Sequence, residues 1–243
     1  MKEYHIFYAP DITESQMLPP EEAAHAVRVL RLKEGDEICA TDGRGHFYDC
    51  TILEATPKRC RVEILAEREQ ARLWQGHIGI AVAPTKNIDR IEWLAEKATE
   101  IGMDTLTMLD CTNSERRIVK TERIEKILVS AMKQSHKAYK PTLEGMTKFN
   151  DFINKPFSGQ RFICHCYSDE DAGTPAVSLV SAINPASDVQ VLIGPEGDFS
   201  IDEVRKAISL GFQPATLGES RLRTETAALC AVHMMYLRKT LIP

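Results

Sequence analysis

The sequence predicts an α/β protein made of two parts, a small β-rich domain over residues 1–70 and a larger α/β domain over residues 75–243. The first part has short apolar runs separated by turn residues, the pattern of a compact sheet or barrel. In the second part, apolar strands alternate with amphipathic helices, which predicts a largely parallel sheet. The polar stretch Glu67–Gln75 lies between the two patterns, and we expect the domain boundary there.

Composition excludes several classes of protein. Of the 243 residues, 43% are hydrophobic and 27% are charged, a balance typical of globular proteins. No apolar run approaches the ~20 residues that a membrane helix needs, and the N-terminal stretch lacks a long apolar segment. The seven cysteines are odd in number and form no CxxC pair, which favours reduced thiols. We therefore expect a cytoplasmic protein without a membrane segment.

In the first part, the predicted elements are a strand at His5–Ala9, a helix at Glu21–Leu32, and strands at Glu37–Thr41, His46–Leu53 and Arg61–Leu65. Between the second and third of these strands, Asp42-Gly43-Arg44-Gly45 is expected to form a hairpin turn. Glycine tolerates the positive φ that such turns require.

In the second part, continuous apolar runs predict strands and one-sided apolar spacing predicts helices. The predicted strands are His77–Ala83, Thr105–Leu109, Arg161–Tyr167, Val189–Ile193 and Pro214–Leu217. The predicted helices are Asn87–Ile101, Thr121–Tyr139, Ile201–Leu210 and Thr224–Arg238. Gly102 is expected to end the first helix, and Ser200 with Glu203 predicts a capping box at the start of the third.

Cys164, His165 and Cys166 are residue types that zinc prefers as ligands. No second pair of such residues lies nearby in the sequence, so we expect no metal site. The two thiols are interpreted as small hydrophobic groups packed in a buried strand.

Two junctions between a strand and a helix are candidates for chemistry. The first is Gly194-Pro195-Glu196-Gly197, and the second runs from Leu217 to Thr224. In open α/β sheets, ligands bind beyond the carboxyl ends of the strands, and glycine lets the backbone approach a ligand closely. The alternative interpretation leaves both loops empty, with Arg221 and Arg223 as solvated charges and Thr224 as a helix N-cap.

Absent motifs narrow the class of ligand. The chain has no GxxxxGK[ST] phosphate loop, no GxGxxG dinucleotide fingerprint, and neither GxSxG nor HExxH. Neither junction offers a lysine that could neutralise phosphates. Such loops suit an adenosine without phosphates, held by backbone hydrogen bonds and apolar contacts, and S-adenosylmethionine is one such ligand.

One basic region stands out on a chain of net charge −5. Residues 116–140 hold eight basic and two acidic residues, a net charge of +6, which leaves −11 elsewhere. The region is predicted to contact RNA phosphates, with its later basic residues along one helix face; the other interpretation is a solvated face. The candidate RNA-binding residues are Arg116, Arg117, Arg123, Lys133, Lys137 and Lys140.

Six segments of the chain carry a family resemblance. They are HAVRVLRLKEGDEICATDGRG (25–45), EKATEIG (96–102), SERRIV (114–119), AMKQS (131–135), GPEGDFS (194–200) and LGESRLRTETA (217–227). Together they resemble the 16S ribosomal RNA uridine N3-methyltransferases, the small-subunit methyltransferase E family of the SPOUT superfamily. The resemblance covers most of the chain, and the last two motifs in combination are highly specific.

The resemblance implies an N-terminal PUA-like barrel that helps to hold RNA and a C-terminal SPOUT domain with a deep trefoil knot. It implies a bent S-adenosylmethionine in the knotted loops, small-subunit ribosomal RNA as partner, and a homodimer whose subunits share the active site. The residues implied to bind the cofactor are Ile193, Gly194, Pro195, Glu196, Gly197, Leu217, Gly218, Ser220, Leu222, Arg223 and Thr224.

The implied reaction removes the N3 proton of uridine and leaves negative charge on the base. A cationic donor would stabilise that charge, and Arg223 is the first candidate for this catalytic role, with Arg116 and Arg117 as phosphate or base contacts. Glu196 or Glu225 would accept the proton, or else orient an arginine. Because N3 lies on the Watson–Crick edge, the uridine has to be unpaired or flipped out.

Two other functions stay open at this point. One is a related knotted methyltransferase acting on another position of ribosomal or transfer RNA, and the other is a ribosome-assembly factor that binds RNA without catalysis. The chain also departs from the family pattern. It has His5 near the start where arginine is usual, Asp198 in place of a second glycine, and His136-Lys137 in place of Gly-Arg.

Overall fold

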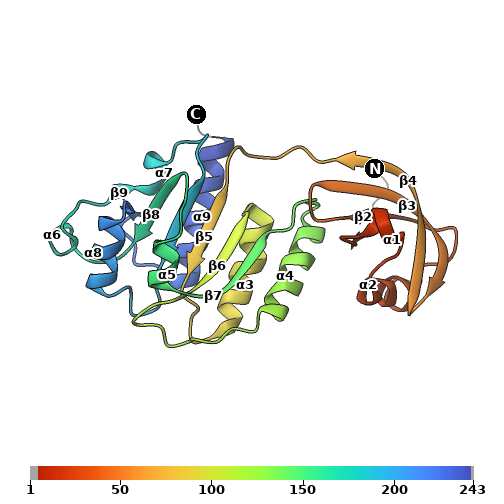
Figure 1. The fold of residues 1–243 in the computed structure, drawn as a ribbon, viewed down its shortest axis with the longest axis horizontal. Helices are drawn as coiled ribbons and strands as arrows, with labels where there is room; N and C mark the ends of the chain where they lie inside the picture. Colours follow the sequence, from red (N-terminus) through yellow and green to blue (C-terminus); the bar gives the residue numbers. More distant parts are fainter. Residues whose placement is uncertain (1–4, 242–243) are drawn as a thin grey trace. The chain divides into compact units, whose positions relative to one another are not determined.

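A computed structural model of the chain describes residues 5–241, which form two compact units (Figure 1). The N-terminal unit consists of residues up to Arg72 together with Val129–Lys140, and the C-terminal unit holds the rest. The division after Arg72 falls within the polar stretch at which the sequence pattern changes. The second segment of the N-terminal unit has no counterpart in the sequence pattern, which places residues 129–140 in the larger domain.

A four-stranded sheet in the order β1-β2-β3-β4 supports the N-terminal unit. Its strands are β1 (Ile6–Tyr8), β2 (Glu37–Thr41), β3 (His46–Thr56) and β4 (Arg59–Glu69), with β1 parallel to β2 and the other pairs antiparallel. The core of the unit also includes residues of α1 (Ile12–Ser15), α2 (Pro20–Ala24) and the π-helical turn η1 (His25–Val29). The predicted helix Glu21–Leu32 therefore ends early, in this π-helical turn.

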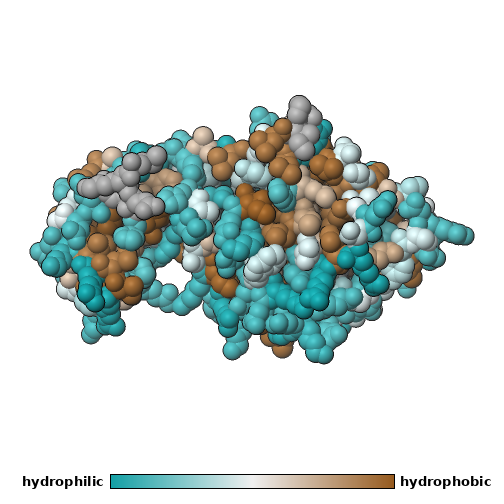
Figure 2. Space-filling view, turned by 180° about the vertical axis from the view of Figure 1, so that it is seen from behind, coloured by the Kyte–Doolittle hydropathy of each residue, from teal (hydrophilic) through white to brown (hydrophobic). Residues whose placement is uncertain are grey.

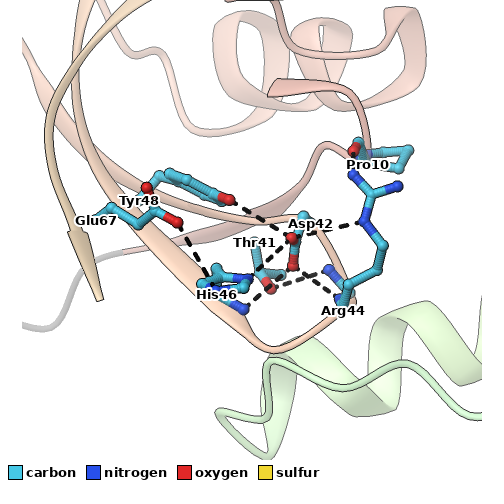
Figure 3. Close-up of polar contacts among 8 residues, drawn as sticks. Pro10, Thr41, Asp42, Arg44, His46, Tyr48 and Glu67 are labelled. Atoms are coloured by element: carbon cyan, nitrogen blue, oxygen red, sulfur yellow. Dashed lines mark hydrogen bonds and ion pairs between the residues drawn. The ribbon is translucent and has the colours of Figure 1, made fainter. Parts of the chain in front are cut away.

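The carboxylate of Asp42 holds the turn between β2 and β3 (Figure 3). It is 5% exposed and accepts hydrogen bonds from the backbone N–H groups of Arg44 (2.7 Å) and His46 (3.2 Å). Gly43 and Gly45 have φ of +73° and +118°, as the predicted hairpin requires. Since a buried carboxylate is costly without donors, this network fixes the turn.

Residues 129–140 are bound to the same turn. The N–H of Gly45 donates to the carbonyl of Ala138, and the N–H of Lys140 donates to the carbonyl of Gly43, each at 2.9 Å. An ion pair adds to these bonds, because Lys133 Nζ lies 2.5 Å from Glu22 Oε1. Lys133 is only 22% exposed, so its charge is already used within the unit.

Helix α4 (Thr121–Gln134) ends before the predicted Tyr139, and the prediction of its C-terminus was wrong. His136 adopts φ +54°, the left-handed conformation that commonly ends helices, and the N–H of Lys137 returns to the carbonyl of Met132 at 3.0 Å. Lys137 and Lys140 consequently lie beyond the helix. The basic helix face predicted from the sequence does not form.

The C-terminal unit contains a seven-stranded sheet in which every pair of neighbours is parallel, which confirms the predicted class. The strand order is β7-β6-β5-β10-β8-β11-β9. The strands are β5 (Ile78–Val82), β6 (Thr105–Asp110), β7 (Thr142–Lys148), β8 (Gln160–Cys164), β9 (Val177–Ser178), β10 (Val189–Ile193) and β11 (Gln213–Thr216).

Helices cover both faces of this sheet, so alternate residues of a central strand enter two different cores. In β10, Val191 joins the core that includes α3 and α9, whereas Leu192 joins the core that includes α5 and α8. The helices are α3 (Ile88–Ile101), α5 (Phe149–Ile153), α6 (Asp169–Ala172), α7 (Leu179–Ala182), α8 (Ile201–Ser209) and α9 (Thr224–Thr240). The predicted capping box at Ser200 and Glu203 is present. Across residues 5–241, no helix combines the length and apolar character needed to cross a membrane.

One lysine holds the last turn of α9 to the segments that precede β5 and β10. Lys239 Nζ donates to the backbone carbonyls of Gln75 (2.9 Å), Pro185 (3.0 Å) and Ser187 (2.5 Å), and burial lowers the pKa of this amine. An ammonium group has three donors, and all three are used here. We expect Lys239→Met to lower the free energy of unfolding by about 1–3 kcal/mol, measured by urea denaturation.

Lys206→Met is the matched control for this prediction. Lys206 Nζ makes one hydrogen bond, to Asn150 Oδ1 at 2.8 Å on the surface, so the loss should stay below about 0.5 kcal/mol. Equal free energies of unfolding of the two variants would show that the three hydrogen bonds of Lys239 do not stabilise the fold.

Candidate functional site

A cavity of about 1030 Å³ lies at the carboxyl ends of three adjacent strands of the C-terminal unit. Its walls are the segments that follow β8 (164–166), β10 (193–198) and β11 (215–224), together with Arg90 of α3 and Ala227 of α9. The crevice beyond parallel strand ends is where open α/β sheets bind ligands. Both junctions singled out in the sequence therefore open onto one space.

Every residue proposed from the sequence to hold a cofactor lines this cavity. These residues are Ile193, Gly194, Pro195, Glu196, Gly197, Leu217, Gly218, Ser220, Leu222, Arg223 and Thr224. Their proximity is a structural fact, and their roles in binding stay predictions.

The loop after β10 is closely packed against itself. A Cβ on Gly194 would lie 3.0 Å from the backbone nitrogen of Phe199, so only glycine fits without a shift. The carboxylate of Asp198 accepts hydrogen bonds from the N–H groups of Phe199 and Cys166, each at 2.7 Å. Asp198 thus ties the loop after β10 to the loop after β8. It does so at φ +63°, a conformation that aspartate tolerates better than most residues.

The loop after β11 is joined to the loop after β10 by the hydroxyl of Thr224, which donates to the carbonyl of Gly194 at 3.1 Å. Thr224 is the first residue of α9 and Arg223 occupies the N-cap, so the reading of Thr224 as N-cap was wrong. Gly218 has φ +120°, and a Cβ there would meet no protein atom within 4 Å. This backbone position is open toward a ligand.

The segment after β8 is a part of the site that the sequence did not suggest. The strand ends at Cys164 and not at the predicted Tyr167, and Cys164, His165 and Cys166 line the cavity. Cys166 is exposed, so the prediction that both thiols pack in a strand was wrong for this residue. Both ring nitrogens of His165 are buried without a hydrogen bond of normal geometry, and burial lowers the pKa of the ring. Burial therefore favours the neutral form of the His165 ring.

Glu196 and Glu225, the candidate proton acceptors, both have partners. Glu196 Oε1 accepts a hydrogen bond from the backbone N–H of Lys86 at 2.9 Å. Glu225 Oε1 lies 3.3 Å from Arg90 Nη1, and its other oxygen is buried. Arg223, the candidate for charge stabilisation, is exposed at the cavity.

Most of the candidate RNA-binding residues are engaged within the protein. Arg116 donates to the carbonyls of Thr85 (3.0 Å) and Lys86 (2.5 Å), and Arg117 bonds to Asp110 and Thr112. Arg123 forms a bidentate pair with buried Glu92, with both N···O distances at 2.6 Å. Lys133 is paired with Glu22, as described above. The charge count of residues 116–140 thus overstates the cations that are available to a ligand.

In this protein, loops at the ends of three neighbouring parallel strands surround one cavity. This arrangement defines the class of α/β proteins that bind a cofactor-sized ligand at the carboxyl ends of the strands. A model described as "RNA methyltransferase domain" matches residues 72–236, and one described as "RNA methyltransferase PUA domain" matches residues 18–65. The chain belongs to this RNA methyltransferase family and is a methyltransferase.

Individual relatives resemble the chain over nearly its whole length. A crystal structure described as a "probable rRNA-methyltransferase from Porphyromonas gingivalis" is 42% identical, covers 96% of this chain and 98% of its own, and has a TM-score of 0.89. The ribosomal RNA small subunit methyltransferase E from Neisseria gonorrhoeae, bound to S-adenosylmethionine, is 25% identical, with coverage of 95% for both chains and a TM-score of 0.82. The protein of the same name from Buchnera aphidicola is 27% identical over 91% of this chain and 87% of its own.

Proposed function

We propose that this protein transfers the methyl group of S-adenosylmethionine to N3 of a specific uridine in 16S ribosomal RNA. The observation that carries the proposal is the cavity, because it gathers both family motifs around one space that is large enough for S-adenosylmethionine. The relatives support the cofactor and the substrate, since one of them is bound to S-adenosylmethionine and two are named for the small ribosomal subunit. With such a substrate, we expect the protein to act in the cytoplasm.

The lining of the cavity fits S-adenosylmethionine chemically. Ile193, Leu217 and Leu222 offer apolar surface, and the absence of a side chain at Gly218 lets a ligand approach the backbone closely. The family resemblance implies a trefoil knot, and we expect the loops after β10 and β11 to form it. When bound, the cofactor supplies an activated methyl group, and the protein has to supply position and charge.

Residues of this chain can supply the position and the charge that the reaction needs. Arg223 lies at the cavity with its guanidinium exposed, where it can stabilise the negative charge that develops on the uracil ring. Glu196 and Glu225 are better suited to holding the loop after β5 and Arg90, respectively, than to accepting the N3 proton.

Transfer of a labelled methyl group to 16S ribosomal RNA, followed by mass mapping of the modified nucleotide, tests the proposal. Free RNA and assembled small subunits should be compared, together with RNA from cells lacking the protein. We expect a single N3-methyluridine. A label at another position of ribosomal or transfer RNA would favour the related methyltransferase, and cofactor-independent RNA binding without transfer would favour an assembly factor.

RNA affinity is expected to depend on the segment after α4. Lys137 and Lys140 are the two candidate RNA-binding residues that lie in this segment. Replacing both by glutamine should flatten the logarithmic salt dependence of RNA binding by about 1.4, because each contact to single-stranded RNA contributes about 0.7. S-adenosylmethionine affinity should not change.

The control removes the same amount of charge elsewhere, with Lys155→Gln and Lys206→Gln together. This double variant should keep the wild-type salt dependence in a fluorescence titration. If the two double variants behave alike, the segment after α4 does not contact phosphates.

A homodimer is expected from the surface of α9. Ala228, Ala231 and Met235 are buried in the core, yet Met234 and Leu237 are only partly buried. Figure 2 shows hydrophobic side chains gathered on this face of the C-terminal unit. A helix that is apolar on more than one side needs a second partner.

Glutamate at both Met234 and Leu237 should therefore convert a dimer into a monomer at micromolar concentration in light scattering. Arg205→Glu on α8 is the control and should leave the dimer intact. A wild-type protein that is already monomeric would remove both the dimer and the shared active site.

A further inference from the structure

Arg90 is a residue of the cavity that no family motif in the sequence indicates. It lies in the first turn of α3, and its side chain is 36% exposed. Its guanidinium forms an ion pair with Glu225 of α9, in which Nη1 and Oε1 are 3.3 Å apart. The pair joins two helices at the wall of the cavity.

Glu225 is an unusual partner, because it is almost completely buried. The residue is 8% exposed, and its second oxygen, Oε2, has no hydrogen-bond partner in the described part of the chain. A buried carboxylate with an unpaired oxygen lowers stability, and apolar residues of similar size often pack equally well. The burial of the Glu225 carboxylate therefore points to a role for the Arg90 guanidinium with which it pairs.

The geometry also limits what Glu225 can do itself. Its free oxygen is shielded from solvent, so a substrate base cannot reach it to transfer a proton. One Nη of Arg90 is engaged with Oε1, whereas a guanidinium carries five N–H donors. Glu225 therefore orients Arg90 and leaves other N–H donors of its guanidinium at the wall of the cavity.

We propose that Arg90, positioned by Glu225, binds the carboxylate of the cofactor's amino-acid end. A guanidinium recognises carboxylates and phosphates through paired hydrogen bonds. Phosphates of RNA are the other source of such an anion, but Arg221 and Arg223 are more exposed and suit a large ligand better. The inference rests on the proposed function, because it takes S-adenosylmethionine as the ligand of the cavity.

The test compares two ligands that differ in the anionic group. S-adenosylhomocysteine carries the carboxylate, and 5′-methylthioadenosine keeps the adenosine and the sulfur but lacks the amino-acid end. Calorimetry on the full-length protein should show that Arg90→Gln weakens binding of S-adenosylhomocysteine about 10- to 100-fold, the effect of losing a hydrogen bond to a charged group. Binding of 5′-methylthioadenosine should change less than twofold.

Three further variants make the result specific. Glu225→Gln should shift the same ligand preference in the same direction, by less than Arg90→Gln. Arg90→Lys keeps the charge but not the paired donors, so it should recover part of the lost affinity. Lys97→Gln, on the same helix and paired with Glu96 and Glu100 outside the cavity, should bind both ligands as the wild type does.

Equal weakening of both ligands by Arg90→Gln would overturn the inference, since it would indicate a structural role alone. So would unchanged binding of both ligands, or a loss confined to RNA, which would assign the anion to a phosphate. All three results require a wild-type protein that binds S-adenosylhomocysteine. A wild type that binds neither ligand would overturn the proposed function, and this inference with it.

Discussion

Replacing Arg223 by glutamine is expected to lower kcat for methyl transfer by about 100- to 1000-fold, the usual effect of removing one donor that stabilises charge in the transition state. The uracil ring gains negative charge only as its N3 proton leaves. A cation at that point stabilises the transition state more than the bound substrate. Affinity for S-adenosylmethionine should therefore stay within about threefold of the wild type.

The structure gives Arg223 the freedom that this role needs. It is the N-cap residue of α9 and makes no side-chain cap, and its guanidinium has no ion-pair partner among residues 5–241. Arg116, Arg117 and Arg123 are each held by other protein groups. A cation without such partners can turn toward a base that enters the cavity.

Single-turnover kinetics on 16S ribosomal RNA would separate the chemical step from binding. Arg205→Gln serves as the control, because Arg205 lies on α8 and bonds to the carbonyl of Asp171 away from the cavity. It should retain the wild-type rate. If Arg223→Gln transfers methyl groups within threefold of the wild-type rate, Arg223 is not the charge-stabilising residue.

The C-terminal fold could be predicted because its strands are buried on both faces. Such strands appear in the sequence as continuous apolar runs, and β10 matches its predicted range, Val189–Ile193. Local chemistry also predicted the ends of two helices, since Gly102 ends α3 and Ser200 caps α8. β7 (Thr142–Lys148) was missed because this edge strand is only partly buried and has no apolar run.

The end of α4 could not be predicted from its own residues. The apolar spacing continues to Ala138, which is buried, but in the core of the N-terminal unit, against Cys39 and Phe47. Hydrogen bonds to the turn at Gly43 and Gly45 hold this segment out of the helix. Contacts that join residues about a hundred positions apart leave no periodic trace in the sequence.

The candidate site shows the same limit. Glycines after strands β10 and β11 identify the cavity, because only the local backbone is involved. Arg90 and His165 reach the same cavity from other elements. Nothing in the sequence indicates Arg90, and the sequence suggested His165 only as a metal ligand. The sequence also overestimated how many basic residues of 116–140 are available to bind RNA. Their acidic partners, such as Glu92 and Glu22, lie far from them in the sequence, so the pairing could not be foreseen.

Gly218→Val is expected to weaken S-adenosylmethionine binding by about 100-fold or more, through two effects that can be separated. The residue has φ +120°, and forcing a side chain into such a conformation costs on the order of 1–3 kcal/mol. In addition, the new side chain would point into open space, with no protein atom within 4 Å of its Cβ. At the wall of the cavity, that space is where a bound adenosine would lie.

Gly173→Val distinguishes the two effects, because Gly173 also has a positive φ, +78°, and open space around its Cβ, but lies at the end of α6 outside the cavity. Both variants should lose stability in thermal denaturation, and only Gly218→Val should lose cofactor affinity in calorimetry. A Gly218→Val protein that is folded and binds S-adenosylmethionine as tightly as the Gly173→Val protein would show that the cofactor does not approach this backbone. The cavity would then have to bind its ligand through the loops after β8 and β10 alone.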